Sequence, residues 1–491
     1  MGFLFVEGSW DNMSLTFKKV YTVSKKGRNR PRIWLYETVS EAAGFQIGQP
    51  LYISLDVEQQ QIIIQNAPIS DDDHVVHVTG KKNETSGKLR PIVDTAKDSY
   101  RSIIDVSQKA EICVYREGEM SKVIIRPLRY NSFDKEVLVK PDDERITTFT
   151  ICSGMGVVTA AFQETGYFTS VGAIELEEDS SSVYRHNFKS SFVFNGDLRD
   201  CSTVAKADVA IVTLPCDKHS LIGDGEGAVF RNLAFATSEL IRATECRAVF
   251  FENVPQFYES EEYQDIKNLL MNDYPFWQEQ RIEAADFGSL ARRKRVYALA
   301  VKSEEDFLHF QFPSPPKRTI RKKVREYLDR KGTPHEWKPL EKWMQSFTSK
   351  AEKGNSWSER GLAKTFVDEM ATEIQCIPKR YTAQSASSSY LLSEDRNYFR
   401  FFSINEILRI LSVPAWFEIP DYIGKIRQYE MLGQSVDCRV IASIANRLAA
   451  MFYKVRRNKI ENSSYKEKDY QKMRYSIPIS LNQHGQLELV F

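Results

Sequence analysis

Residues 149–162 read Phe-Thr-Ile-Cys-Ser-Gly-Met-Gly-Val-Val-Thr-Ala-Ala-Phe, and this stretch decides the fold of the larger part of the chain. Its first residues, Phe149–Cys152, form an apolar strand-like run, and Val158–Phe162 is a helix candidate. The intervening loop, Cys152-Ser153-Gly154-Met155-Gly156, contains two glycines. Glycines at the carboxyl end of a parallel strand let the backbone turn sharply and approach a ligand. The stretch therefore predicts the first strand, loop and helix of a ligand-binding α/β fold.

Strand-like runs continue to alternate with helical stretches after this segment. The further predicted strands are 171–174, 209–213, 248–251 and 296–301. Helical patterns return at 404–411 and 440–451, beyond a region rich in proline and polar residues. This alternation is the βαβ pattern of a parallel sheet. We expect an α/β, Rossmann-like sheet with an inserted lobe.

Acidic residues follow the second and third candidate strands. Glu175 ends the second, where an acid can bind two ribose hydroxyls. Asp197, in Gly196-Asp197-Leu198, is placed to accept a hydrogen bond from an adenine amino group. Each acid alone is typical of an ordinary turn or of the protein surface. Their succession on consecutive strands indicates an adenosyl cofactor.

A thiol and a carboxylate end two further strand-like runs. Cys216 lies in Leu214-Pro215-Cys216, after the run Val209–Val212, and Glu252 follows Phe250-Phe251. These are the two groups that covalent chemistry on a pyrimidine ring needs. A Pro-Cys pair by itself is more often structural, because free cysteine is among the most buried residue types.

The motifs together resemble those of the cytosine-C5 DNA methyltransferase family over residues 146 to about 452. Six segments occur in the family's order: the cofactor loop at 152–156, the nucleophile motif Pro215-Cys216, Glu252-Asn253-Val254, Phe287-Gly288 with Arg293-Lys294-Arg295, Arg400 with Glu406, and Gly433-Gln434-Ser435-Val436. Six matches in order are far more specific than any one of them.

The resemblance implies a role for each matched residue. Cys216 would add to C6 of cytosine, Glu252 would protonate or hydrogen-bond N3, and Arg293 with Arg295 would orient the ring. The methyl donor implied is S-adenosyl-L-methionine, and no metal is expected. The implied cofactor contacts are Cys152, Ser153, Gly154, Met155, Gly156, Glu175, Asp197, Leu198, Pro215, Ser435 and Val436. A base inside a duplex is out of reach, so it would be flipped out.

The chain departs from the family pattern at three positions. Asp217 follows the cysteine where the family usually has glutamine, Ala291 replaces the glutamine of the arginine motif, and Gln434 stands where asparagine is preferred. A negative charge beside the thiol opposes thiolate formation unless Lys218 or His219 offsets it. The geometry of the pocket is therefore open to question.

Residues 313–398 occupy the position of the family's target-recognition region. The predicted DNA contacts are Lys379, Arg380 and Gln384 from this region, together with Ser220. Its tryptophans, Trp337, Trp343 and Trp357, have a second interpretation as a small local core. The flanking parts would be a catalytic core at 146–312, its C-terminal part at 399–455 and a basic tail at 456–491.

Residues 1–140 contain short strands and two similar units about sixty residues apart. The first unit, around Gly44–Ile53, resembles the swapped-hairpin barrels of AbrB/SpoVT-type transcription factors. A generic small β-barrel is the other interpretation. We expect a β-rich, barrel-like module, and the sequence leaves open whether it binds DNA or docks a partner subunit.

The composition of the 491 residues is that of an ordinary globular protein, with a net charge of +1. The seven cysteines include no Cys-x-x-Cys pair, which argues against a zinc ribbon or a disulfide framework and favours a reducing, cytoplasmic setting in a bacterium. No apolar stretch approaches a membrane span. Basic residues cluster at 18–32, 317–325 and 454–459, as solvated faces or as phosphate contacts.

The sequence therefore predicts methyl transfer from S-adenosyl-L-methionine to C5 of cytosine in double-stranded DNA. With no nuclease motif, the chain would act in restriction-modification or phage defence beside a cognate nuclease or defence subunits. One alternative is a tRNA cytosine-C5 methyltransferase. Another is a catalytically silent nucleic-acid-binding regulator, which Asp217 and Ala291 motivate.

Overall fold

The computed structural model describes residues 13–68, 74–82, 89–128, 135–138, 144–215, 233–317, 321–352, 364–462, 479–481 and 487–489. Cys216, Asp217, Ser220 and Trp357 lie outside these ranges. Among the described residues, no helix is both long and apolar enough to cross a membrane.

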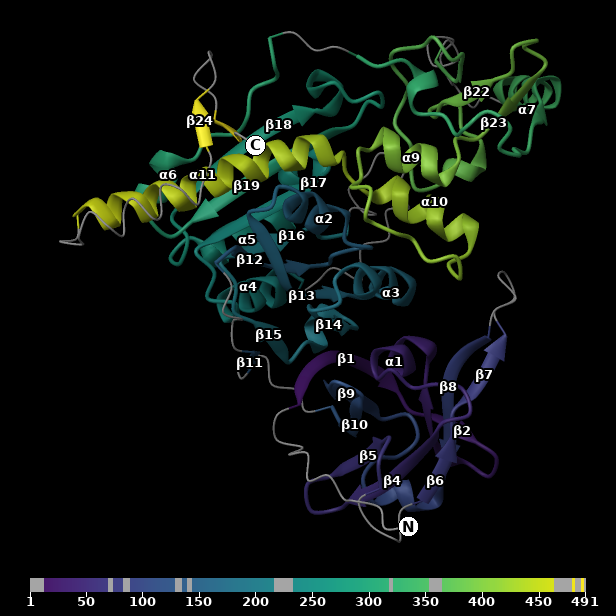
Figure 1. Cartoon of the computed structure of the whole chain (residues 1–491), viewed down its shortest axis with the longest axis vertical. Coiled ribbons are helices and arrows are strands. Elements are labelled where there is room, and N and C mark those ends of the chain that lie inside the picture. Colours follow the sequence, from purple (N-terminus) through teal and green to yellow (C-terminus); the bar gives the residue numbers. More distant parts are fainter. Residues whose placement is uncertain are drawn as a thin grey trace.

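The part of the chain from residue 146 to residue 462, called the catalytic part after the resemblance described above, is built on one sheet (Figure 1). Hydrophobic cores lie on both faces of this sheet. Its strands are β12 (Ile146–Ile151), β13 (Phe168–Glu175), β14 (Phe192–Asn195), β16 (Val209–Val212), β17 (Ala248–Asn253), β18 (Phe276–Glu283) and β19 (Lys294–Val301). In space the order is β18-β19-β17-β16-β12-β13-β14. The strands from β17 to β14 are parallel, and β19 is antiparallel to both neighbours. Every residue of β12, β14, β16 and β17 is buried, as expected for parallel strands that are covered on both faces.

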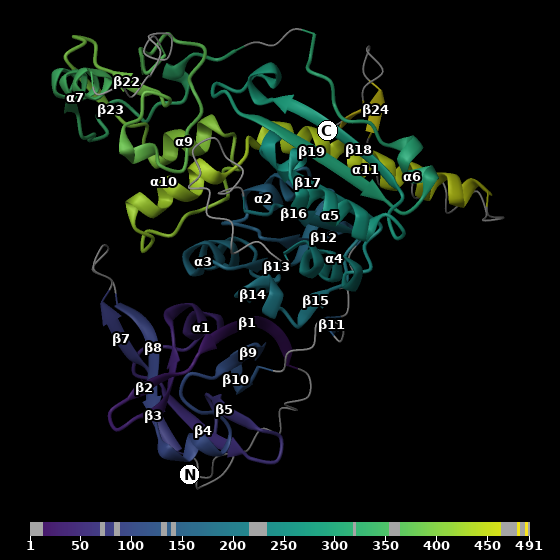
Figure 2. The same cartoon turned by 180° about the vertical axis from the view of Figure 1, so that it is seen from behind.

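Helices cover both faces of this sheet. They are α2 (Val157–Glu164), α3 (Glu178–Asn187), α4 (Leu233–Ala243), α5 (Glu261–Leu270), α6 (Glu304–His309) and α11 (Cys438–Asn462). Val209 and Ile211 share a hydrophobic core with α2, α3 and α11, whereas Ala210 and Val212 share another with α4 and α5. Alternate strand residues point to opposite faces, so the two cores lie on opposite sides. Figure 2 shows α4 and α5 in front of the sheet and α11 behind it.

Residues 321–400 form a separate lobe beside the sheet (Figure 1). Its elements are η6 (Val324–Glu326), β20 (Lys338–Pro339), α7 (Leu340–Glu352), β21 (Phe366–Val367), η7 (Tyr381–Ala383), β22 (Tyr390–Leu392) and β23 (Tyr398–Arg400). Trp343 is buried, with its ring centroid 5.2 Å from that of Phe347 and 4.9 Å from that of Phe366. Trp343 therefore belongs to a local aromatic core, which was the second interpretation of the tryptophans, whereas that interpretation is wrong for Trp337, which is 41% exposed. After the lobe come α9 (Ile404–Ile410) and α10 (Lys425–Gln434).

The N-terminal module consists of two halves with the same order of elements. The first half holds β1 (Ser14–Thr22), β2 (Ser24–Lys26), β3 (Arg30–Leu35), α1 (Glu37–Ala42), β4 (Pro50–Asp56) and β5 (Gln61–Gln65). The second holds β6 (His74–His77), β7 (Thr79–Lys82), β8 (Leu89–Ala96), η2 (Asp98–Ser102), β9 (Lys109–Glu117) and β10 (Met120–Pro127). Equivalent strands pair across the halves, β3 with β8 and β5 with β10, and β1 pairs with β9 as β6 does with β4.

The module and the catalytic part share one continuous sheet. Strand β1 is antiparallel to β9 on one edge and parallel to β14 on the other, so the combined sheet has 13 strands. The connection between the two parts contains β11 (Glu136–Leu138), which pairs with β15 (Thr203–Ala205). The remaining short elements are η3 (Leu198–Asp200), η4 (Pro255–Glu259), η5 (Ala284–Phe287), β24 (Ile479–Leu481) and β25 (Leu487–Leu489). The α/β fold with an inserted region and a β-rich N-terminal module is confirmed.

Two lysines of the basic stretch 18–32 are neither a solvated face nor available to phosphate, contrary to both interpretations of that stretch. Lys18 is fully buried and Lys19 is 7% exposed. Lys18 Nζ lies 3.1 Å from Glu111 and 3.2 Å from Glu136, while Lys19 Nζ lies 3.0 Å from Glu178. Both lysines belong to β1, whose two edges are occupied, and buried charges persist where they are paired.

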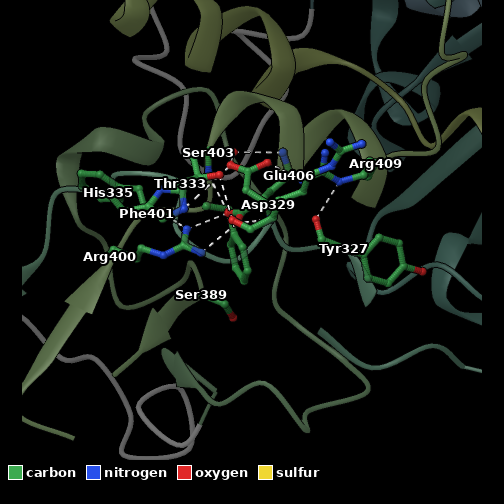
Figure 3. A network of polar contacts seen from close by, with 12 residues as sticks. Tyr327, Asp329, Thr333, His335, Ser389, Arg400, Phe401, Ser403, Glu406 and Arg409 are labelled. Carbon is green, nitrogen blue, oxygen red and sulfur yellow. Dashed lines mark hydrogen bonds and ion pairs between the residues drawn. The ribbon is translucent and has the colours of Figure 1, made fainter. Parts of the chain in front are cut away.

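A buried ion pair joins the inserted lobe to the helices that follow it (Figure 3). The guanidinium of Arg400, in β23, donates to both carboxylate oxygens of Glu406, in α9, at 2.7 and 2.8 Å. Glu406 also accepts from the backbone N–H groups of Ser403 and Asp329, at 2.8 and 2.9 Å. Glu406 is fully buried and Arg400 is 4% exposed. The carboxylate is therefore satisfied by donors from three segments.

The carboxylate of Asp329 completes this network. It accepts from the hydroxyl of Ser403 at 2.6 Å and from Arg409 at 2.5 Å, and His335 lies 3.9 Å away. Asp329, His335 and Glu406 bring three potential metal ligands within 4.8 Å of one another. Arginine, hydroxyl and backbone N–H donors already occupy the carboxylates of Asp329 and Glu406. We therefore interpret the cluster as a structural contact that connects the lobe to α9.

We expect Arg400→Ala to lower the free energy of unfolding by about 3–5 kcal/mol, because it leaves the charge of Glu406 buried and uncompensated. Urea unfolding followed by tryptophan fluorescence measures the change. Arg396→Ala is the matched control, since the Arg396 side chain is 74% exposed, and no measurable change is expected. Equal stability of both variants would show that the pair does not hold the lobe.

Candidate functional site

The loop after β12 has the tight backbone that its glycines predicted. Cys152, Gly154 and Gly156 all have positive φ, at 58°, 54° and 96°. A side chain at position 156 would lie 2.7 Å from the rings of Tyr184 and Phe188, so only glycine fits at the start of α2. A side chain at position 154 would meet nothing within 4 Å. The loop therefore leaves open space beside Gly154.

The carboxylate of Glu175 closes this loop from the next strand. One of its oxygens accepts from the backbone N–H of Gly154 at 2.6 Å, and the other from that of Glu177 at 2.9 Å. Glu175 is 7% exposed, and burial raises its pKa to about 7, against these two hydrogen bonds. Each carboxylate oxygen has two lone pairs, so each can accept one further hydrogen bond, as a ribose diol requires.

Asp197 follows β14 but is already engaged within the chain. Its carboxylate accepts from the backbone N–H and from Nε of Arg199, at 2.9 and 2.8 Å. Burial raises the pKa of Asp197, but the hydrogen bonds from Arg199 outweigh it and the net shift is downward. Leu198, the neighbouring predicted contact, is buried. An adenine amino group would share Asp197 with this arginine, which the sequence did not predict.

Asn195 is a polar residue of the site that sequence reasoning missed. Its side-chain amide donates to the carbonyl oxygens of Glu175 and Leu176, at 3.0 and 3.1 Å. It thereby fixes the end of β14 to the turn after β13. Its position two residues before Asp197, at the end of an apolar run, was the available signal.

Two hydrogen bonds hold the segment that leads to the predicted nucleophile. The hydroxyl of Thr213 donates to the carbonyl oxygen of Cys152 at 2.7 Å. The amide of Asn253, next to Glu252 in β17, donates to the carbonyl oxygen of Leu214 at 3.0 Å. Pro215 is exposed at the end of this segment. The chain thus leaves the sheet between the glycine loop and the strand that carries Glu252.

Glu252 pairs with one of the two predicted arginines. Nε of Arg295, in the adjacent strand β19, lies 3.1 Å from a carboxylate oxygen of Glu252. Burial raises the pKa of Glu252, and Arg295 and Arg293 offset that shift only in part. Glu252 is 8% exposed, so its carboxyl can hold a proton at a pH where an exposed glutamate would be ionised.

Arg293 ties the inserted lobe to α10. Its guanidinium donates to the carbonyl oxygen of Ile377 at 3.2 Å and to that of Gly433 at 2.9 Å. A side chain at Gly433 would overlap the carbonyl of Pro378, at 2.2 Å, so the lobe touches the helix backbone directly. Arg293 is 3% exposed. These contacts give it a structural role beside the ring-orienting one implied by the resemblance.

The remaining predicted residues lie in two places. Ser435 and Val436 follow α10, where the hydroxyl of Ser435 donates to the carbonyl of Met431 at 2.8 Å and Val436 is buried in the core. One loop around η7 contains Lys379, Arg380 and Gln384. This loop starts at Lys379, two residues after Ile377. Arg380 is exposed, Lys379 is half-buried, and the carbonyl of Gln384 accepts from the indole of Trp343 at 3.0 Å.

Comparison with known proteins identifies the family. The model of the C-5 cytosine-specific DNA methylase family matches residues 146–450, more than half of the chain, and the chain belongs to this family. Methyltransferases of this family use S-adenosyl-L-methionine as methyl donor. The glycine loop and the buried Glu175 fit such a cofactor, because open space beside Gly154 adjoins a carboxylate with unused lone pairs.

Curated relatives are type II methyltransferases. The chain is 29% identical over 181 residues to M.Bsp6I of Bacillus sp. (strain RFL6), which covers 35% of this chain and 57% of the relative. It is 24% identical over 306 residues to M.MspI of Moraxella sp, covering 60% and 69%. The match to M.Bsp6I thus spans little more than half of that protein. A solved DNMT2 mutant from Spodoptera frugiperda gives a TM-score of 0.48 at 17% identity, over 62% of this chain and 99% of that one.

We expect the affinity for S-adenosyl-L-methionine to fall as the pH is lowered below about 7. The pKa of Glu175 is raised, so its carboxyl becomes neutral in that range and accepts hydrogen bonds less well. The loss should reach up to about tenfold per pH unit in calorimetric titrations. Glu175→Gln should bind weakly without this pH dependence, and the exposed-site variant Glu164→Gln should behave like the unmodified protein. A pH-independent affinity would contradict the assignment.

Proposed function

We propose that this protein transfers a methyl group from S-adenosyl-L-methionine to C5 of cytosine in double-stranded DNA, with Cys216 as the covalent nucleophile. The family match supports the reaction class. The observation that carries the residue assignment is the pair of hydrogen bonds at Thr213 and Asn253. They anchor the segment ending at Pro215 between the glycine loop and Glu252, and Cys216 is the next residue.

The chemistry begins with addition of the Cys216 thiolate to C6, which forms an S–C6 bond and shifts electron density to C5. Glu252, whose pKa burial raises, holds a proton toward N3 and so neutralises the charge that would develop on the ring. Nε of Arg295, 3.1 Å from a carboxyl oxygen of Glu252, orients this side chain by donating to it. When bound, S-adenosyl-L-methionine would supply the electrophilic methyl group that C5 takes, with S-adenosyl-L-homocysteine leaving with the electrons of the broken S–CH3 bond. Loss of the C5 proton to a base and cleavage of the S–C6 bond then restore the aromatic ring.

Reaching C6 requires an extruded base, because a stacked and paired cytosine hides that carbon from a thiol. We assign sequence readout to the inserted lobe, with Lys379, Arg380 and Gln384 as contacts, and keep Ser220 as a further DNA contact that the family resemblance implies. The contacts of Arg293 support the assignment of readout to the lobe, since they connect the segment before Lys379 to α10. Relatives named type II methyltransferases favour DNA over tRNA and favour a restriction-modification or defence setting with a cognate nuclease.

We expect the protein to be trapped covalently on a duplex containing 5-fluorocytosine in the presence of the cofactor, because fluorine at C5 blocks the elimination step. Cys216→Ser should give no adduct in denaturing electrophoresis. Cys246→Ser, which changes a buried thiol outside the nucleophile motif, should trap normally. Tight binding without any adduct would favour the silent regulator, and trapping only on tRNA would favour the RNA enzyme. Bisulfite sequencing of DNA from expressing cells would give the target motif.

For the N-terminal module, we propose DNA contact through the sheet β2-β3-β8-β7. Lys25, Arg28, Arg30, Lys81 and Lys82 are exposed there, and the one acid of β8, Asp94, is neutralised by Lys26 and Arg32 at 2.7 Å. The guanidinium of Arg32 stacks over the ring of Trp34, with the guanidinium carbon 3.7 Å from the ring centroid. Basic residues around an aromatic ring suit a phosphate backbone. Docking of an acidic partner subunit is the competing role.

We expect the triple variant Lys25→Ala, Arg28→Ala and Lys81→Ala to bind duplex DNA more weakly and with a shallower salt dependence. Each lost phosphate contact should reduce the slope of log K against log salt by about 0.9. Fluorescence anisotropy at several salt concentrations measures both quantities. Lys189→Ala with Lys302→Ala, two exposed lysines of the catalytic part, is the control. An unchanged slope in the triple variant would favour partner docking.

A further inference from the structure

The strand shared by the two parts lies directly beside the proposed cofactor site. In the parallel pairing of β1 with β14, Lys18 is opposite Phe194 and Lys19 is opposite Asn195. Asn195 is the residue that fastens the end of β14 to the carbonyl of Glu175. Beyond it, a side chain placed on Gly196 would lie 3.5 Å from Cβ of Val20. The N-terminal module therefore packs against the turn that carries Asp197.

The module also holds the turn that carries Glu175. Glu178, the first residue of α3, accepts an ion pair from Lys19 at 3.0 Å and a hydrogen bond from the hydroxyl of Thr38 at 2.7 Å. Only two residues lie between Glu178 and Glu175, and one of them, Glu177, donates its backbone N–H to the Glu175 carboxylate. The Lys19 side chain is 9% exposed and that of Glu178 is 36% exposed, so solvent reaches this pair mainly from the glutamate side. Two side chains from the module thus fix one end of a turn whose other end is the proposed ribose acid.

Two further contacts fix the segment after Asp197. Lys109, in β9, donates to Asp200 at 2.6 Å. Lys18 donates to the hydroxyls of Ser202 and Thr203, at 3.1 and 2.5 Å. Both turns of the site are therefore bracketed by cations of the N-terminal module.

We infer that the N-terminal module is a positioning element of the S-adenosyl-L-methionine site, with Lys19 as its central residue acting through Glu178 on Glu175. The inference rests on the proposed cofactor role of Glu175. It gives the module a function in the catalytic part that is independent of whether its other face binds DNA. The same contacts explain why β1 joins the sheet at β14, the strand whose end carries Asp197.

The test is the affinity of the full-length protein for S-adenosyl-L-methionine, measured by calorimetry without DNA. We expect Lys19→Met to weaken binding by about tenfold, the scale of one lost charge-assisted hydrogen bond. Lys19→Arg should restore most of the affinity. Lys26→Met is the control, because it breaks an ion pair of the same kind within the module, with Asp94, and should leave the affinity unchanged.

Hydrogen exchange separates positioning from general stabilisation. The backbone amides of Gly154 and Glu177, which bind the Glu175 carboxylate, should exchange faster in Lys19→Met than in Lys26→Met. Equal affinity and equal exchange in these two variants would overturn the inference. Should Lys19→Met fail to fold, Thr38→Val removes the other hydrogen bond to Glu178 and should weaken binding two- to fivefold. An unchanged affinity in Thr38→Val would then overturn it.

Glu175→Gln distinguishes the inference from the function on which it rests. Weak binding by Glu175→Gln together with normal binding by Lys19→Met would reject the positioning role and leave the cofactor site standing. Normal binding by Glu175→Gln would reject both. Weak binding by both variants, with rescue by Lys19→Arg, would support both.

Discussion

The catalytic sheet is covered by helices on both faces, and this constraint shapes everything else in the site. In the strands that are buried throughout, charged side chains lie only near the strand ends, and the polar residues farther in are the threonines of β12. The glycine loop, Glu175, Pro215 and Glu252 all lie at such ends, on four strands of the same parallel array. Hydrogen bonds between neighbouring strand ends, as at Thr213 and Asn253, then set the spacing of the reactive groups.

Burial at the strand ends also sets the acid–base character of the site. Glu175 and Glu252 both have raised pKa values because each carboxyl is withdrawn from water. Their partners differ, since backbone N–H groups bind the first and an arginine the second. The same physical cause therefore acts on two carboxyls whose proposed roles differ, one accepting hydrogen bonds from a ribose and the other holding a proton toward the cytosine ring.

The sequence predicted the catalytic strands well because complete burial leaves a continuous apolar signal. It placed β17 and β19 within two residues of their ends. It could not predict β18, whose residues are mostly exposed or half-buried and show no clear period. The pairing of β1 with β14 was equally hidden, because backbone hydrogen bonds between strands leave no mark on side-chain type. For that reason Lys18 and Lys19 were interpreted as surface cations, although the sheet buries them.

The sequence predicted the positions of single site residues better than it predicted the contacts between them. The position of Glu175 at the end of its strand could be read from the sequence, and its carboxylate accepts from the glycine loop. The hydrogen bond from Arg199 to Asp197 could not be predicted, because it depends on side-chain conformation. The contacts of Arg293 with Ile377 and Gly433 depend on how the lobe folds back, over 84 and 140 residues of chain. Separation of this size is invisible to any local pattern.

The shared sheet has a consequence for how the chain is made. Lys18 and Thr203 are 185 residues apart, so β1 emerges from the ribosome long before its partner strand exists. Until β14 is made, the edge of β1 that will face it has unpaired N–H and C=O groups, and Lys18 is not yet buried. An unpaired strand edge of this kind can pair with another chain and cause aggregation. Biosynthesis must therefore tolerate an N-terminal module with an unpaired strand edge, and a chaperone that shields strand edges would raise the yield of native protein.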